Sequence, residues 1–166
     1  MKYRLRIMQF LIGLSILGLV LATYSLLHKT GLVPGSFCDI NTKFNCDVVN
    51  RGAYSDIGVI PVALLGVIGY VFFLAASILK LREPHDRHTS LFLLLATGCG
   101  FLFSLYLSSI EEFVLHTWCI VCLSSQFTVA ALFILSCWLF LGERSASRKE
   151  QVSEIVKSAA QDISEL

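Results

Sequence analysis

Four long apolar segments limit the ways in which this chain can fold. They cover residues 8–27, 57–79, 90–110 and 119–141, and none of them contains Asp, Glu, Lys or Arg. Each is about as long as the roughly 20 residues that a helix needs to cross the hydrocarbon core of a bilayer. Because hydrocarbon offers no hydrogen-bond partner, an apolar span must satisfy its backbone groups internally, as a helix does. The sequence therefore predicts an all-α membrane protein, a four-helix transmembrane bundle.

Composition supports this class of protein. Only 15% of the residues are charged and 55% are hydrophobic, with a net charge of +1, whereas an ordinary soluble domain is about a quarter charged. We expect no nucleic-acid partner for such a chain. The first apolar segment is longer than the roughly 7–15 residues of a signal-peptide core, so a retained helix is favoured over a cleaved signal.

Lysine and arginine are divided unequally between the connections. The N-terminal arm, the turn between the second and third segments and the C-terminal tail carry ten, and the loops 28–56 and 111–118 carry three. Since cytoplasmic connections are enriched in these residues, both termini are predicted in the cytoplasm and both loops on the outer face of the cell membrane. We therefore expect a transmembrane domain over 1–141 and a cytoplasmic amphipathic tail over 142–166.

Four of the six cysteines fall on the predicted outer face. Cys38 and Cys46 lie in the loop 28–56, and Cys119 and Cys122 lie at the outer end of the fourth helix. Disulfides form and persist outside the cytoplasm. The orientation was deduced from Lys and Arg alone, so this clustering is an independent observation.

The C-x-x-C pair stands where redox chemistry is favoured. Residues i and i+3 in the first turn of a helix bring two thiols within disulfide range. Free N–H groups and the helix dipole there favour the thiolate, which is the reactive form. Trp118 precedes the pair and suits the membrane interface, where a lipid-dissolved oxidant can reach it. A redox role is therefore favoured for Cys119 and Cys122.

Two structural alternatives remain for the loop cysteines. The pair Cys38 and Cys46, separated by seven residues and followed by Asp39 and Asp47, can form a static disulfide that pins the loop. A four-cysteine zinc site is disfavoured, because the spacing is wider than the usual C-x₂₋₄-C and the compartment is oxidising. We expect no metal.

The two remaining cysteines lie inside predicted helices. Cys99 falls near the middle of the third segment and Cys137 near the inner end of the fourth. Neither has a partner at its depth, so both are expected to be apolar core thiols.

The order of these features resembles the vitamin K epoxide reductase (VKOR) family. A loop pair is followed by "GVIPVALLGVIGY" opening one helix and "FVLHTWCIVC" opening the last, and "NCDVVNRGAYSDIGVIPVALLG" resembles the prokaryotic branch. The DsbB family has related chemistry, but its C-x-x-C precedes its spaced pair. Many prokaryotic members carry a fused thioredoxin-like domain, and the short tail here leads us to expect a separate partner.

This resemblance implies a membrane thiol:quinone oxidoreductase that generates disulfides. Cys38 would take electrons from a thioredoxin-fold thiol oxidase of the DsbA type, Cys46 would pass them to Cys119, and Cys122 would lie beside the quinone. The quinone type, whether menaquinone, ubiquinone or vitamin K, is left open. The alternatives are epoxide reduction of the vertebrate type and a non-enzymatic, disulfide-stapled membrane protein.

The chain departs from the family pattern near the implied quinone site. Gly52 stands where the family usually has Ser or Thr, and Ser55 is three residues away as a substitute. Gln126 occupies the position of a Tyr in vertebrate members, and its amide can donate to a quinone carbonyl or pack between helices. Glu111, Glu112 and His116 can relay protons to a quinone, or belong to a solvated loop.

Overall fold

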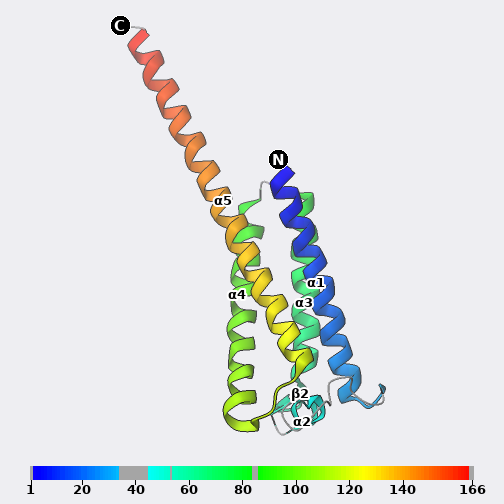
Figure 1. The fold of residues 1–166 in the computed structure, drawn as a ribbon. Helices are drawn as coiled ribbons and strands as arrows, with labels where there is room; N and C mark the ends of the chain where they lie inside the picture. Colours follow the sequence, from blue (N-terminus) through cyan, green and yellow to red (C-terminus); the bar gives the residue numbers. More distant parts are fainter. Residues whose placement is uncertain (1, 34–44, 53, 84–85, 165–166) are drawn as a thin grey trace.

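The computed structural model describes residues 2–33, 45–52, 54–83 and 86–164 (Figure 1). Four of its helices are long and apolar enough to cross a membrane, which confirms the predicted four-helix architecture. A short helix, a hairpin of two-residue strands and a π-helical turn complete the described part. The elements are α1 (Lys2–Lys29), α2 (Cys46–Arg51), β1 (Asp56–Ile57), β2 (Ile60–Pro61), α3 (Val62–Arg82), α4 (Arg87–Ile110), η1 (Glu111–Leu115) and α5 (Ile120–Ser164).

The long helices pack as a bundle in which α1 contacts α3 and α5, and α4 contacts α5 and α3. Leu11, Leu93 and Leu132, on three different helices, have no exposed surface and mark its core. Helix α1 approaches α3 closely at Gly18, where a Cβ atom would lie 2.0 Å from the Tyr70 ring. Small residues permit such contact between membrane helices.

Hydroxyl groups inside the helices are satisfied by the backbone. The hydroxyls of Ser15, Ser77, Thr97 and Ser136 each donate to the carbonyl four residues earlier, at 2.7 Å. Since hydrocarbon offers no water, this bond removes the cost of an unpaired polar group. These hydroxyls therefore fit a lipid-embedded bundle.

The two ends of the bundle differ. Cys46, Cys119 and Cys122 define what we call the cysteine end, where α2 and the hairpin also lie, and the first residues of α1 lie at the opposite end (Figure 1). At that opposite end Lys80 and Glu143 form a buried ion pair of 2.7 Å. The Lys80 amino group also donates to the carbonyl of Asp86, 2.6 Å away. The pair thus joins α3, the α3–α4 connection and α5.

Three sequence expectations are corrected or refined. The second helix begins at Val62, because β1 and β2 form an antiparallel hairpin over residues 56–61. The last helix runs without a break to Ser164 and projects beyond the bundle (Figure 1), so the expected tail is its continuation. Cys99 is exposed on the surface of the bundle, so its assignment to the core was wrong. The predicted orientation in the membrane remains a prediction.

Candidate functional site

The sulfur atoms of Cys46 and Cys119 lie 3.1 Å apart, although 73 residues separate them in the chain. Cys46 is 1% exposed and Cys119 is fully buried, so water is excluded from the contact. Cys46 takes part in a disulfide bond, whereas Cys119 and Cys122 are free thiols. The structure therefore places a disulfide sulfur against a thiol, which is the arrangement that thiol–disulfide exchange requires.

Backbone contacts bring the two cysteine segments together. The side chain of Asn45 caps α2 by accepting a hydrogen bond of 3.0 Å from the N–H of Val48. The N–H of Asn45 itself donates to the carbonyl of Trp118 at 3.2 Å. Asn45 and Trp118 each directly precede a cysteine of the contact, so this bond sets the register between the two segments.

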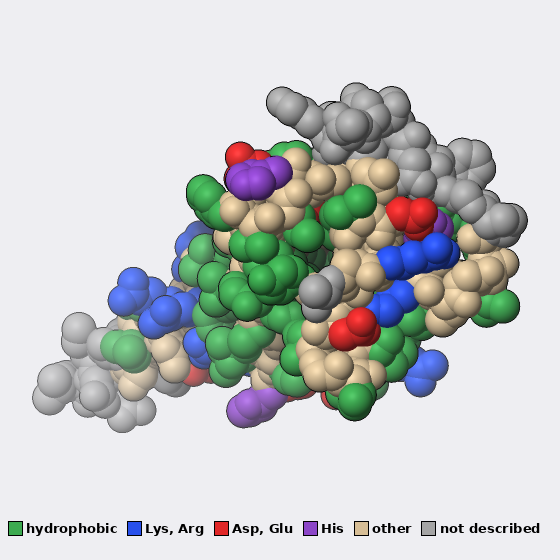
Figure 2. All heavy atoms as spheres, turned by 90° about the horizontal axis from the view of Figure 1, so that it is seen from below, with side chains coloured by type: hydrophobic (Ala, Val, Ile, Leu, Met, Phe, Trp, Pro, Cys, Tyr) green, Lys and Arg blue, Asp and Glu red, His purple; other side chains and the backbone are tan. Residues whose placement is uncertain are grey.

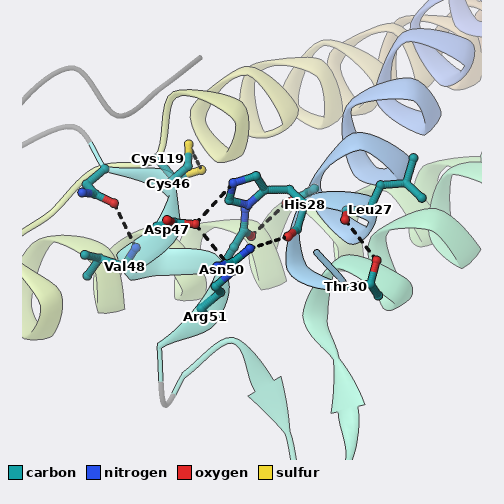
Figure 3. A network of polar contacts seen from close by, with 11 residues as sticks. Leu27, His28, Thr30, Cys46, Asp47, Val48, Asn50, Arg51 and Cys119 are labelled. Carbon is teal, nitrogen blue, oxygen red and sulfur yellow. Dashed lines mark hydrogen bonds and ion pairs between the residues drawn. The ribbon is translucent and has the colours of Figure 1, made fainter. Parts of the chain in front are cut away.

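Helix α2 is also anchored to the end of α1 (Figure 3). The Nε2 atom of His28, which is 1% exposed, lies 3.3 Å from a carboxylate oxygen of Asp47. Arg51 donates to the backbone carbonyl of His28 at 3.2 Å, and the hydroxyl of Ser25 donates to the side-chain oxygen of Asn50 at 2.8 Å. These contacts hold both ends of α2 and hence fix the position of Cys46.

Cys119 and Cys122 lie where the sequence predicted, at the start of the last helix. Cys119 directly precedes α5, and the N–H of Cys122 donates to its sulfur at 3.2 Å. Such a bond stabilises negative charge on the sulfur that faces Cys46. Cys119 therefore faces Cys46, and Cys122 lines the cavity between the helices.

A carboxylate closes the site from the side of α4. Glu111, in the π-helical turn η1, is 4% exposed, and its Oε2 atom accepts a hydrogen bond of 3.2 Å from the N–H of Cys119. The turn ends at His116, which has a φ of +50° in the left-handed region, and the N–H of Thr117 donates to the carbonyl of Glu111. Single π-turns often occur at functional sites, because they redirect side chains.

A cavity of about 210 Å³ opens between the four long helices beside Cys122. Seen from the cysteine end, hydrophobic side chains gather near the middle of this face, and a group of acidic and basic side chains lies to the right of them (Figure 2). Mostly apolar walls with a few polar groups are typical of small-molecule sites. The apolar walls include Leu21, Tyr70, Phe73, Phe103, Leu107 and Val129, and the polar lining includes Lys29, Asn50, Ser55 and Glu111.

Ser55 lines this cavity and is held by a lysine. The amino group of Lys29 donates to the carbonyl of Ser55 at 3.1 Å, to its hydroxyl at 2.8 Å and to the carboxylate of Asp56. The Ser55 hydroxyl in turn donates to the carbonyl of Gly52 at 2.7 Å. Ser55 thus has a hydrogen-bonded hydroxyl at the cavity, and its role toward a quinone stays a prediction.

The departure at Gly52 has a steric cause. A Cβ atom at this position would lie 2.4 Å from the backbone carbonyl oxygen of Val48. Real Cβ atoms do not approach backbone oxygen so closely, so Ser or Thr fits there only if the end of α2 moves. The described position of α2 therefore leaves no room for a side chain at residue 52.

Gln126 does not line the cavity. Its side-chain oxygen accepts a hydrogen bond of 2.6 Å from the hydroxyl of Ser108, which does line it. Cys38, the other expected loop cysteine, lies outside the described residues. Within the part of the chain that the structure describes, no group of three or more His, Cys, Asp and Glu residues could hold a metal ion.

Sequence reasoning missed some of these residues. Nothing in the pattern marked His28, Lys29 or Asn50, since polar residues at a helix end usually face solvent. The sequence does not distinguish Glu111 from Glu112, but in the structure Glu111 is buried and Glu112 is exposed. Both belong to the π-helical turn η1, for which the sequence carries no recognisable signal.

Together the fold and the paired cysteines define a multi-pass membrane protein of the thiol-redox class. A model of the Vitamin K epoxide reductase family matches residues 9–137, and the chain belongs to this family. No curated protein matched the chain in a sequence comparison. The family consists of oxidoreductases that are linked to quinones and generally work with thioredoxin-like partners.

Proposed function

We propose that this protein oxidises thiols to disulfides on the outer face of the cell membrane and passes the electrons to a quinone. The contact between Cys46 and Cys119, next to a cavity that contains Cys122, is the observation that carries the proposal. A purely structural disulfide has no need of a free thiol held against it. A relay of two cysteine pairs needs this contact.

Electrons enter at the loop and leave at the helix. A thiolate of a thioredoxin-fold partner attacks the loop disulfide at Cys38, which releases Cys46 as a thiolate. Cys46 then attacks Cys119 of an oxidised Cys119–Cys122 pair and releases Cys122. The second thiol of the partner attacks the partner–Cys38 disulfide, which leaves the partner oxidised and Cys38 as a thiolate. Cys38 then attacks Cys46 of the Cys46–Cys119 disulfide, so the loop disulfide forms again and Cys119 and Cys122 are both thiols. A disulfide-bonded Cys46 beside free thiols at Cys119 and Cys122 supports this order of exchange.

The cavity fits a quinone head group. Its walls suit an apolar ring, and the Ser55 hydroxyl and the Glu111 carboxyl stand at its polar lining. A quinone supplies the oxidising power when bound, because it takes up two electrons and two protons as it becomes a quinol. The chain contributes the thiols, their alignment and the exclusion of water. The resemblance to the prokaryotic branch favours quinone over epoxide as the substrate.

The test is quinone-dependent oxidation of a reduced thioredoxin-fold protein by the purified protein in detergent. We expect oxidation that requires added quinone and is lost in the Cys119→Ala and Cys122→Ala variants. The double variant Cys99→Ala, Cys137→Ala is the matched control and should retain activity. Equal oxidation with and without Cys122 would contradict the proposal. Reduction of an epoxide but not of a quinone would instead favour the vertebrate type of activity.

A further inference from the structure

Glu111 is a buried acid that takes no part in the electron path described above. Its side chain lies near the end of an apolar helix and is 4% exposed. Among the residues that the structure describes, the four ion pairs all involve other carboxylates. An ionisable group in an apolar environment without an opposite charge is costly, and such residues in membrane helices usually mark proton or ion pathways.

The carboxyl group touches the reacting thiols. Its Oε2 atom accepts the N–H of Cys119 at 3.2 Å, and the carboxyl lies near enough to the Cys122 thiol to interact with it electrostatically. Glu111 and Cys122 also line the same cavity. One carboxyl therefore reaches both the thiol that must lose a proton and the space in which the proton acceptor would bind.

We propose that Glu111 is the proton relay of this site, a catalytic residue that takes the proton of the Cys122 thiol and delivers it to the quinone. This role rests on the proposed function. Oxidation breaks the S–H bonds of Cys119 and Cys122 and forms one S–S bond, which releases two electrons and two protons. The quinone takes up both electrons and both protons as it becomes a quinol. Glu111 gains and loses one proton in each turnover and ends unchanged.

Other titratable groups near the cavity are less suited to this role. Glu112 and His116 are exposed and do not line the cavity. Lys29 lines it, but its amino group is bound to Ser55 and Asp56. Two tyrosines also line the cavity. Tyr54 is half-exposed, and the hydroxyl of Tyr70 donates to the carbonyl of Ser125. Glu111 is the acid that combines contact with the thiols and a place in the cavity wall.

Glu111→Gln is the informative variant, because the amide oxygen can still accept the N–H of Cys119 while the side chain can no longer take up a proton. Glu112→Gln is the matched control. The prereduced protein is mixed with a soluble short-chain quinone, and formation of the Cys119–Cys122 disulfide is followed over a range of pH. We expect Glu111→Gln to slow this step by about 10²-fold, which is typical of a lost acid–base group.

The pH dependence separates a relay from a structural role. In the wild type and in Glu112→Gln we expect the rate of disulfide formation to depend on one ionisation. This ionisation should be absent from the pH–rate profile of Glu111→Gln and should return at a shifted pH in Glu111→Asp. Cys122, Lys29, Tyr54 and Tyr70 line the same cavity, Cys119 contacts Glu111, and all five remain in the three variants. A wild-type rate and pH profile in Glu111→Gln would overturn the proposal.

A second reaction distinguishes failure of the relay from failure of the proposed function. Without quinone, oxidised wild-type protein should still accept electrons from a reduced thioredoxin-fold protein in a single burst. If the wild type reacts with the partner but never with quinone, the proposed function itself is wrong.

Chemical modification tests the role of Glu111 in the wild-type protein, so the result does not depend on whether a variant folds. A hydrophobic carbodiimide reacts with protonated carboxyls in apolar surroundings. We apply it to the folded wild-type protein. Loss of the quinone step should follow the fraction of Glu111 modified, as counted by mass spectrometry. Full quinone turnover by protein modified at Glu111 would overturn the proposal.

Discussion

Sγ of Cys46 and Sγ of Cys119 are separated by 3.1 Å, which is about 1 Å more than a disulfide bond. A movement of this size lies within the ordinary motion of a side chain. Helix α2 is held on both sides, by Trp118 and by the end of α1, so the contact does not depend on a chance approach of the loop. Exchange between the pairs therefore needs no large rearrangement of the described residues.

This contact predicts that a mixed disulfide between Cys46 and Cys119 can be trapped. In the variant Cys38→Ala, Cys122→Ala neither thiol that would resolve the bond is present. A protease site engineered near Pro84 cuts the chain between the two cysteines. On a non-reducing gel we expect the two fragments to remain joined, and reductant should separate them.

Cys99 and Cys137 must also be replaced by Ala in this experiment, because both fall in the same fragment as Cys119. Fragments that separate without reductant would show that Cys46 does not reach Cys119, and would favour the static loop disulfide. Restoring Cys122 should abolish the trapped species, which is the matched control.

Gly52 is predicted to be necessary because of its close contact with Val48. Gly52→Ala and Gly52→Ser place a Cβ atom 2.4 Å from the Val48 carbonyl oxygen, so the end of α2 must move. We expect a loss of about 1–3 kcal/mol in unfolding free energy, measured by thermal unfolding in detergent, and slower trapping of the Cys46–Cys119 bond.

Gly142→Ala is the control, since a Cβ atom there meets nothing within 4 Å. It should be neutral or stabilising by up to about 1 kcal/mol, as expected for Gly in a helix. A Gly52→Ser variant as stable as the wild type would show that a hydroxyl at position 52 is tolerated.

Lys29 is predicted to fix the polar end of the cavity. Lys29→Met removes its bonds to Ser55 and Asp56, so the hairpin loses its tie to α1. Hydrogen bonds to charged groups contribute about 1.5–3 kcal/mol, and we expect the KM for quinone to rise about tenfold or more. Lys157→Met, on the exposed part of α5, should leave the KM unchanged.

The same contact has a pH dependence. The hydrogen bond from Lys29 holds the pKa of the Asp56 carboxyl below its usual value. A group with a lowered folded pKa stabilises the fold above its unfolded pKa, and this contribution is lost as the pH falls through the folded pKa. The KM for quinone should therefore rise at acid pH in the wild type but not in Lys29→Met. If the KM depends on pH equally in the wild type and in Lys29→Met, the contact between Lys29 and Asp56 does not control quinone binding.

Orientation is predicted from the distribution of Lys and Arg. Reporter fusions after Leu27 and Ile110 should report the outer face, and fusions after Leu79 and Leu141 the cytoplasm. A cytoplasmic signal after Leu27 would place the cysteine end in a reducing compartment and would remove the basis for disulfide formation.

The helices could be predicted from sequence because hydrocarbon forces an uncharged segment of sufficient length into a helix. The hairpin at 56–61 could not, since Ile57, Val59 and Ile60 extend the apolar run of the helix that follows, and the contact with Lys29 is tertiary. The exposure of Cys99 was missed for a related reason. Lipid and core are both apolar, so hydropathy cannot distinguish the faces of a membrane helix.

In the site, the spacing of Cys119 and Cys122 identified the pair, and the resemblance paired Cys119 with Cys46. The contacts that hold α2 in place could not be predicted, because they involve side chains of α1 that are far away in sequence. The burial of Glu111 depends on a π-helical turn of five residues, for which the local sequence holds no signal.

The buried pair of Lys80 and Glu143 has a consequence for biogenesis. A ribosome delivers Lys80 to the membrane before α4 and α5 exist, so its carboxylate partner is absent when α3 inserts. Until α5 arrives, the long side chain must keep its ammonium group among the lipid head groups. Only when Glu143 has arrived can the Lys80 side chain become buried to the 1% exposure that it has in the folded protein. Insertion of the last helix, which brings Cys122 to the cavity, thus completes the bundle at both ends, and a chain truncated before Glu143 leaves Lys80 without its carboxylate partner.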